Sequence, residues 1–259
     1  MLTYHAPVPV EAVRRAPIPV EMCLSGRDLT EPSIAPRGDV VAFGVRWGRN
    51  AAIALVPVDG GPERLLTTEP PPATGRGMSG GCFAWTPDGG AIVYVGADGN
   101  LWWQDRTAGS ARRLTDVGEG SSLAAPAVSP DGSAVVAALD QAEVWWCTTD
   151  GGRRRRIDDG MADFVFDPSW VPSGSGVAWT AWDVPDMPWD HARMVNVTLD
   201  DGEVVARDEL RPAASIQQVR FQADGRSIAV RDDTGWRNIW TDDEPLVCLL
   251  YTSDAADEL

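Results

Sequence analysis

The residues best suited to bind a ligand lie together in one short stretch, residues 182–193, which reads WDVPDMPWDHAR. The stretch holds two Trp, three Asp, one Arg and two Pro, and each Pro restricts the backbone so that the loop is stiff. Carboxylates held in a stiff loop can bind a positively charged group, and indole rings beside them can bind an apolar one. The candidate binding residues are Trp182, Asp183, Asp186, Trp189, Asp190 and Arg193.

A second stretch formally matches the serine nucleophile motif G-x-S-x-G. Residues 77–81 read GMSGG, with Ser79 at the centre. A nucleophile elbow requires an apolar strand before the serine and a helix after it, whereas here a Pro-rich loop precedes the serine and a strand follows. The chain has only two His, His5 and His191, and neither lies in a suitable setting. We therefore expect Ser79 to lie in a connecting loop and the chain to hold no catalytic residue.

No motif indicates a metal or a nucleotide cofactor. The chain contains no P-loop, no H-E-x-x-H and no G-x-G-x-x-G sequence. Its four Cys are widely spaced and form no C-x-x-C pair, which argues against a zinc site and against a disulfide-rich scaffold. We therefore expect reduced cysteines, no metal and no cofactor.

The overall charge restricts the possible partners. A formal net charge of -16 argues against nucleic acid, which needs a surplus of Lys and Arg, and against an anionic membrane surface. No apolar run approaches the ~18 residues that a membrane helix needs. Residues 1–26 are interrupted by four Pro, so a secretory signal is not expected. These features predict a cytoplasmic protein with no nucleic-acid or membrane partner.

A tight turn recurs through the chain and reveals its repeats. Pro presets the backbone of such a turn, Asp bonds to nearby backbone groups, and Gly accepts a left-handed conformation. The turns lie 42 to 51 residues apart, and each stands between two apolar stretches. They are Pro36-Arg37-Gly38, Pro87-Asp88-Gly89, Pro130-Asp131-Gly132, Pro172-Ser173-Gly174 and Ala223-Asp224-Gly225.

Each repeat contains four short strand-like stretches. Four antiparallel strands in a unit of about 40–50 residues are typical of a β-propeller blade. A β-sandwich would not keep one turn chemistry in one register five times. We predict an all-β protein with about five four-stranded blades in an incomplete ring. The predicted blades are residues 33–67, 83–115, 126–158, 168–208 and 219–243, after a Pro-rich surface segment, 1–32, that could supply a strand to a neighbour.

The direction of the chain predicts where the candidate loop lies. In a blade whose strands alternate in direction, the connection from the second to the third strand shares one face with the connections between blades. The long connections, 68–81, 116–124 and 159–163, should therefore lie on the face that carries residues 182–193.

The run Arg153–Arg156 falls on an outer strand, where it forms either a solvated edge or a contact with an acidic neighbour.

Two segments resemble a known family. Residues 164–193, FVFDPSWVPSGSGVAWTAWDVPDMPWDHAR, and residues 232–240, DDTGWRNIW, are similar to segments of bacterial acylaminoacyl- and dipeptidyl-peptidase-like members of the prolyl oligopeptidase family of serine peptidases. The repeats also resemble those of TolB-like proteins, and the resemblance covers roughly residues 25–245. In the peptidase family the propeller caps a C-terminal α/β-hydrolase domain with a Ser-Asp-His triad.

The resemblance implies a role in peptide hydrolysis. The propeller would gate and position small peptides for an α/β-hydrolase domain, and this chain alone would be inactive. Asp183, Asp186 and Asp190 could then hold the α-amino group of a peptide, and Trp182 or Trp189 an apolar side chain. Alternatively, the loop only packs on the next blade, with Asp190 and Arg193 paired. A different function, also open, is that of a TolB-like scaffold for protein–protein interaction.

The end of the chain departs from the repeat pattern. Sixteen residues follow Asp243, which is far too few for a hydrolase domain. Residues 248–258, CLLYTSDAADE, resemble the translation of a sequencing adapter joined to a truncated gene, and a short genuine tail is the alternative. We expect residues 244–259 to form a tail outside the propeller, with a non-native sequence after about Val247.

Overall fold

The computed structural model describes residues 26–67, 69–75, 81–107, 109–212, 215–242 and 244–246. Ser79 and the predicted adapter-like residues 248–258 lie outside these ranges. All regular structure in the described ranges is β-strand. No helix that is long and apolar enough to cross a membrane occurs in this part of the chain.

Twenty strands form five four-stranded antiparallel sheets, each with its strands in chain order. The first sheet contains β1 (Asp28–Ile34), β2 (Val40–Trp47), β3 (Asn50–Pro57) and β4 (Arg64–Thr67). The second contains β5 (Phe83–Trp85), β6 (Ala91–Val95), β7 (Leu101–Asp105) and β8 (Arg112–Arg113). The third contains β9 (Leu123–Val128), β10 (Ala134–Leu139), β11 (Glu143–Thr148) and β12 (Arg154–Arg156). The fourth contains β13 (Phe164–Trp170), β14 (Gly176–Trp182), β15 (Arg193–Asp200) and β16 (Glu203–Leu210). The fifth contains β17 (Ile216–Phe221), β18 (Ser227–Arg231), β19 (Asn238–Thr241) and β20 (Glu244–Pro245).

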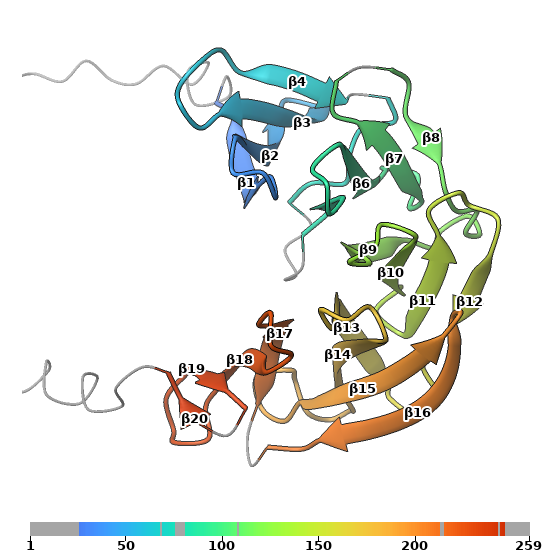
Figure 1. Ribbon diagram of the computed structural model, residues 1–259, viewed down its shortest axis with the longest axis vertical. Coiled ribbons are helices and arrows are strands. Elements are labelled where there is room, and N and C mark those ends of the chain that lie inside the picture. Colours follow the sequence, from blue (N-terminus) through green and yellow to red (C-terminus); the bar gives the residue numbers. More distant parts are fainter. Residues whose placement is uncertain are drawn as a thin grey trace, which may run out of the picture.

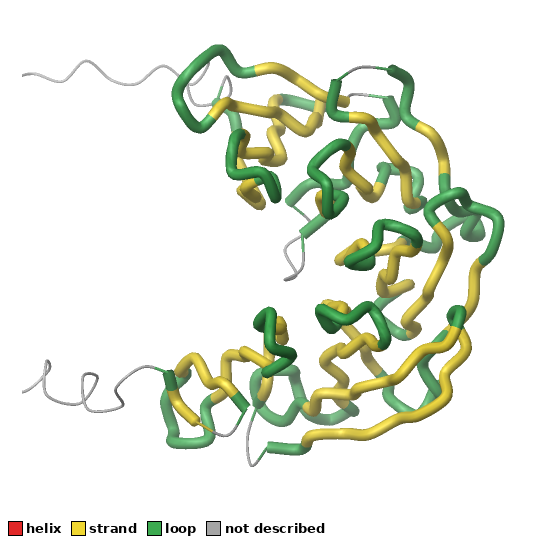
Figure 2. Tube along the Cα trace, viewed as in Figure 1, coloured by secondary structure: helices red, strands yellow, loops and turns green. Residues whose placement is uncertain are grey.

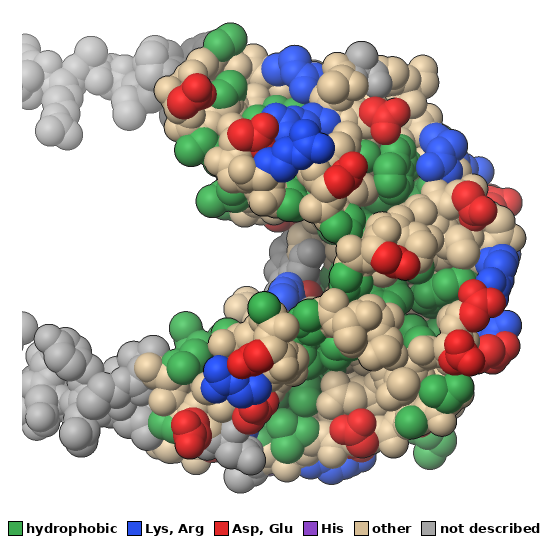
Figure 3. Space-filling model, viewed as in Figure 1, with side chains coloured by type: hydrophobic (Ala, Val, Ile, Leu, Met, Phe, Trp, Pro, Cys, Tyr) green, Lys and Arg blue, Asp and Glu red, His purple; other side chains and the backbone are tan. Residues whose placement is uncertain are grey.

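The five sheets follow one another around an arc, with β9, β13 and β17 near its centre and β12 and β16 at its rim (Figure 1, Figure 2). Consecutive sheets pack face to face, as the blades of a propeller do. The predicted fold, an all-β propeller with five four-stranded antiparallel blades, is therefore confirmed. The arc is open between the first and fifth blades (Figure 3).

The innermost strands are longer than the sequence pattern indicated. They begin at Asp28, Leu123, Phe164 and Ile216 in the first, third, fourth and fifth blades, a few residues before the predicted boundaries. Each of these strands contains an irregularity in its pairing, and such a bulge hides the strand from a simple alternating pattern. A non-glycine residue with left-handed backbone lies in each of the four strands: Glu31, Ala125, Asp167 and Gln218.

A separate apolar core fills the space between neighbouring blades. Tyr94 contributes to the core between the first and second blades, and Trp179 to the core between the third and fourth. Both side chains are buried, with exposed fractions of 0% and 1%. Each aromatic side chain of this kind removes roughly 150–250 Å² from water, so packing between blades is a large part of the folding free energy.

The tight turns are held by their own side chains, as the sequence predicted. The carboxylate of Asp88 accepts hydrogen bonds from the Thr86 hydroxyl at 2.7 Å and from the Gly90 N–H at 2.9 Å. These bonds, the one from Thr86 first, lower the pKa of Asp88. Ser129 and Asp131 repeat the arrangement in the third blade, with their oxygens 2.5 Å apart.

Arginine side chains join the blades along the rim. The sequence contains no Lys, so every basic side chain other than His is a guanidinium. Arg153 pairs with Asp201 of the fourth blade at 2.7 Å, and Arg155 pairs with Glu203. The arginine run on the third blade therefore contacts an acidic neighbour. Several arginines donate to main-chain oxygens of the adjacent blade or connection: Arg37 to Asp88, Arg64 to Arg106, Arg112 to Thr149, Arg154 to Asp116 and Arg207 to Ile157.

We predict that Gly99→Ala destabilises the chain more than Gly120→Ala. Both glycines have left-handed backbone, with φ of +80° and +86°, so either alanine costs about 1–2 kcal/mol. A Cβ at Gly99 would also clash with the main-chain oxygen of Ser121, whereas a Cβ at Gly120 would meet no atom within 4 Å. Urea unfolding should show a loss of roughly 2–5 kcal/mol for Gly99→Ala. Equal losses for the two variants would contradict the packing described for Gly99.

Candidate functional site

The elaborated loops share one face of the propeller. The connection from the third to the fourth blade meets the loop between β14 and β15, because the Asp163 N–H donates to the Asp183 carboxylate at 3.1 Å. Val184 N–H in turn donates to Asp163 at 2.9 Å. In the second blade, Ala73 of the preceding connection donates to the Val95 carbonyl at 2.8 Å. The long loops thus lie where the chain direction predicts, opposite the tight turns.

Two of the candidate residues are structural. The Trp182 side chain is 5% exposed and stacks on Phe164, with ring centroids 5.3 Å apart. Arg193 is buried and forms an ion pair of 2.6 Å with Asp183. This hydrogen bond from Arg193 is the main cause that lowers the pKa of Asp183. Neither Trp182 nor the Arg193 guanidinium therefore faces solvent to receive a ligand.

The alternative interpretation of the loop paired Asp190 with Arg193, and this ion pair is not formed, since Arg193 pairs with Asp183 and lies 3.6 Å from Glu209. The Asp190 carboxylate accepts the Met187 N–H at 3.1 Å and so closes a turn within the loop. Asp190 is three residues from Arg193 along the chain, but the turn at 187–190 directs it back into its own loop. The sequence alone did not distinguish between the two aspartates as partners.

The loop is also fastened to the fifth blade. The main-chain oxygen of Pro188 accepts a hydrogen bond from the Ser215 hydroxyl at 2.7 Å and one from the Gln217 amide at 2.8 Å. These contacts match the interpretation that the loop packs on the next blade. They hold the loop in place and leave part of it at the surface.

The exposed part of the loop is apolar and acidic. Trp189 is 51% exposed, Val184 and Met187 of the same loop are exposed, and so is Met161 in the connection between the third and fourth blades. We name these four residues the insertion patch. Asp186 lies beside the patch, 3.5 Å from His191 Nδ1, and has no arginine partner among the described residues. The patch and Asp186 are thus the candidate residues that remain available to a ligand or a partner.

A pocket of about 380 Å³ lies near the centre of the propeller on the same face. Its lining includes Glu31, Asp140, Gln141 and Phe166, together with connection residues such as Ser122. Glu31 accepts the Cys82 N–H at 2.8 Å, and Asp140 accepts the Ser122 N–H at 2.7 Å. Among the described residues, two acidic and no basic side chains line the pocket, so this part of its wall favours a cation.

This central pocket is not predicted from the sequence. Glu31 falls in the predicted Pro-rich segment, residues 1–32, and no role is predicted for Asp140 or Gln141. The three residues share a left-handed backbone, with φ between 52° and 58°. Glu31 stands five residues before its tight turn, as Asp167 does in the fourth blade, so aligning the repeats further upstream could have placed it at the centre. No group of three His, Cys, Asp or Glu side chains that could hold a metal occurs in the described ranges.

Comparisons with known proteins identify the fold but not a close relative. No family model matches the chain, and no curated protein matches it. A puromycin-hydrolysing peptidase from Mycobacterium tuberculosis superimposes with a TM-score of 0.73 at 23% identity, over 87% of this chain and 38% of that one. A puromycin hydrolase gives a TM-score of 0.71 at 22% identity, over 88% and 39% of the two chains. A putative TolB from Agrobacterium tumefaciens gives a TM-score of 0.57 at 26% identity, over 77% and 72%.

The class of protein is therefore a β-propeller, on the evidence of the five blades and of these structures. The likeness to puromycin-hydrolysing peptidases confirms, at the level of the fold, the predicted resemblance to peptidase propellers. The chain spans about two fifths of the length of the peptidases that it matches.

We predict that the Asp183–Arg193 pair stabilises the fold only while Asp183 is ionised. Asp183→Asn removes the nearer of the two carboxylates beside the buried guanidinium and leaves Glu209 at 3.6 Å, which should lower the free energy of unfolding at pH 7 by on the order of 1–3 kcal/mol. Because Arg193 lowers the folded pKa of Asp183, this stability is present above the unfolded pKa of about 4 and is lost as the pH falls through the folded value.

Urea unfolding between pH 7 and pH 3 checks this expectation, and the gap between the natural chain and Asp183→Asn should close in acid. Asp186→Asn is the matched control, since both carboxylates are 45% exposed but Asp186 has only His191 beside it. A gap of the same size at pH 3 would show that the ion pair is not the cause.

Proposed function

We propose that this chain is the propeller part of a longer, cytoplasmic serine peptidase of the prolyl oligopeptidase family. In that protein the propeller admits small peptides to an α/β-hydrolase domain and orients them there. The observation that carries the proposal is that the acidic central pocket lies on the same face as the insertion patch and the long connections. Elaborated loops on a rigid scaffold are the usual place for binding residues.

The fold comparison supports the proposal. The chain matches about two fifths of each puromycin-hydrolysing structure, which leaves room in such a protein for a catalytic domain. The insertion patch would contact that domain or the apolar side chain of a peptide. The propeller itself supplies no catalytic group in this proposal, so the chain alone is expected to be inactive.

The chemistry of the face suits the free amino end of a peptide. The α-amino group carries a positive charge below its pKa of about 8. Glu31 and Asp140 line the central pocket, and Asp186 stands beside the exposed ring of Trp189. Among the three aspartates of the loop, Asp186 is the one without an arginine or main-chain N–H partner in the described structure, which makes it the strongest candidate for the amino group.

The first test is the gene from which the chain derives. The proposal requires that the reading frame continues beyond the propeller into a G-x-S-x-G between a strand and a helix, followed by an Asp and then a His. A reading frame that ends without this segment would exclude the peptidase.

The second test uses the longer protein and two substrates that differ only at the amino end. We predict that Asp186→Asn lowers kcat/KM for an alanyl anilide by about 10- to 100-fold, because a hydrogen bond between charged groups is lost. The N-acetylated substrate, which has no charge there, should be unaffected. Val58→Ala is a matched surface control, since Val58 is exposed and follows β3 on the face of the tight turns. Equal kcat/KM values for the natural protein and Asp186→Asn would exclude the amine-binding role.

A second candidate function is a scaffold for protein–protein interaction of the TolB type. The observation in its favour is that this chain covers more of the TolB structures than of the peptidases, namely 72% of one TolB structure and 55% of another. The insertion patch would then bind a protein partner instead of a hydrolase domain. A reading frame without the hydrolase segment favours this alternative.

A further inference from the structure

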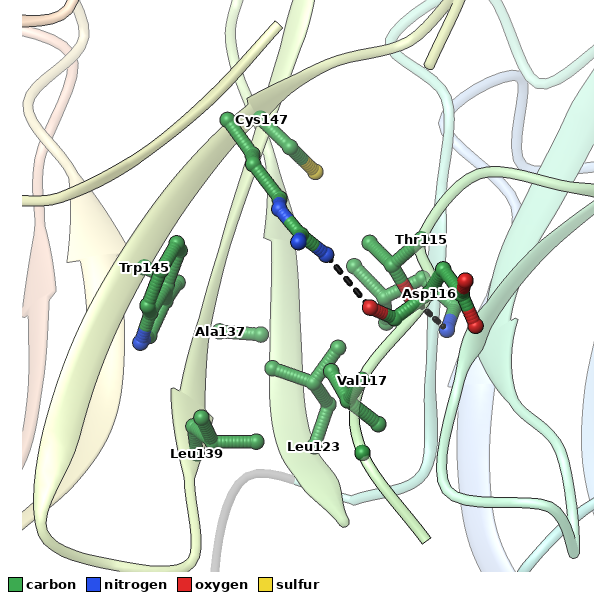
Figure 4. Close-up of a pocket in the computed structure, with 11 residues that line it drawn as sticks. Thr115, Asp116, Val117, Leu123, Ala137, Leu139, Trp145 and Cys147 are labelled. Atoms are coloured by element: carbon green, nitrogen blue, oxygen red, sulfur yellow. Dashed lines mark hydrogen bonds between the residues drawn. The ribbon is translucent and has the colours of Figure 1, made fainter. Parts of the chain in front are cut away.

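A cavity of about 160 Å³ lies between the second and third blades, next to the central pocket, with which it shares Leu123 (Figure 4). Leu123, Leu139, Trp145 and Cys147 are among the side chains that line it. Burial raises the pKa of the Cys147 thiol to about 12, so this part of the wall is uncharged at neutral pH. Asp116, Gly118 and Arg154, which also line the cavity, are exposed, so the cavity opens to solvent at that end.

The repeat structure explains why the space is empty. The second strands of the second, third and fourth blades carry Tyr94, Ala137 and Trp179 at equivalent positions, and each residue belongs to the core shared with the preceding blade. Where two blades have a buried aromatic ring, the third has a methyl group. The fifth blade has Ala229 at this position, and its cross-strand neighbour Trp240 is buried. The cross-strand neighbour of Ala137 is Trp145, which is half-buried and lines the cavity.

A cation remains beside the empty position. In the fourth blade Val177, Val197 and Arg207 lie side by side across three strands, and the guanidinium of Arg207 lies 5.5 Å from the centre of the Trp179 ring. In the third blade the same register brings together Val135, Cys147 and Arg154, so Arg154 is the counterpart of Arg207. Arg154 lines the cavity.

The two arginines differ in their anionic partners. Arg207 forms a salt bridge of 3.2 Å with the Asp159 carboxylate. Arg154 donates to the main-chain oxygen of Asp116 and has no salt bridge among the described residues. The carboxylate of Asp116 pairs with Arg113 instead, at 2.8 Å. In the third blade, Arg154 lies 5.9 Å from the centre of the Trp145 ring, which is across the strand from Ala137. The third blade therefore keeps the cation, but lacks a ring at position 137 and a carboxylate partner for Arg154.

We propose that this cavity binds a small molecule with one aromatic ring that bears a carboxylate, of which benzoate is the simplest example. The ring takes the place that Trp179 and Tyr94 fill in the neighbouring blades. The carboxylate pairs with Arg154, as Asp159 pairs with Arg207. A dry cavity of about 150 Å³ elsewhere accepts benzene, so the volume suits a single ring. Guanidinium and carboxylate groups can form two parallel hydrogen bonds, which favours this anion over a neutral polar group.

Titration of the full chain with sodium benzoate, followed by calorimetry and by saturation-transfer NMR of the ligand, tests the proposal. We expect a Kd on the order of 0.1–1 mM for a ligand of this size. Arg154→Met should weaken benzoate binding at least about 10-fold and change the binding of neutral benzyl alcohol less than about twofold. Arg155→Met is the matched control, because Arg155 pairs with Glu203 and does not line the cavity, and it should leave both affinities unchanged.

Ala137→Phe provides an independent test, since it places a ring in the cavity as the neighbouring blades do. This variant should abolish benzoate binding without lowering the melting temperature. Absence of benzoate binding to the natural chain at 10 mM, or unchanged affinity in Arg154→Met, would overturn the proposal. Retained binding in a folded Ala137→Phe variant would overturn it as well. If Ala137→Phe does not fold, the comparison of Arg154→Met with Arg155→Met decides the question.

Discussion

A four-stranded blade has two apolar faces, and both can be buried only if another blade packs on each side. This constraint is visible in the second strands. Every residue of β6 and β14, in the second and fourth blades, is buried. In β2 and β18, which belong to the first and last blades, buried and half-buried residues alternate through most of the strand, since each of these blades has a neighbour on one side only. The half-buried residues of β2 and β18 therefore belong to the two blades that border the opening of the arc.

The same packing divides the molecule into two unlike faces. Turns such as Thr86–Gly90 are closed by their own side chains, and so they add little surface that a ligand could use. The opposite face carries the long connections, the insertion patch and the central pocket. A rigid scaffold with variable loops on one side can acquire a binding site without any change to its core. The loop at residues 182–193 illustrates this, because Trp182 anchors it in the core and Trp189 stands at the surface.

The sequence was sufficient to predict the fold because the turn chemistry is local. Pro, Asp and Gly act on their own backbone; Gly ends the turn in all five blades, Pro begins it in four and Asp is central in three. The details of the site could not be predicted in this way. Arg193 had Asp183 and Asp190 within reach along the chain, and only the three-dimensional path of the loop selects Asp183. The bulged first strands likewise hid Glu31, since a left-handed residue interrupts the alternation that a strand pattern relies on. The methyl group of Ala137 becomes informative only beside Trp179, when the two blades are compared in register.

Some of the contacts that the guanidinium groups make between blades along the rim do not depend on pH. A guanidinium does not lose its proton in proteins, and a main-chain carbonyl does not titrate at all. The bonds from Arg37, Arg64, Arg112 and Arg207 to carbonyls of the neighbouring blade or connection therefore have no titratable member. The carboxylate pairs beside them weaken in acid, but this second set of links does not. Neither acid nor alkali directly removes these bonds from guanidinium groups to carbonyls, which link the first four blades.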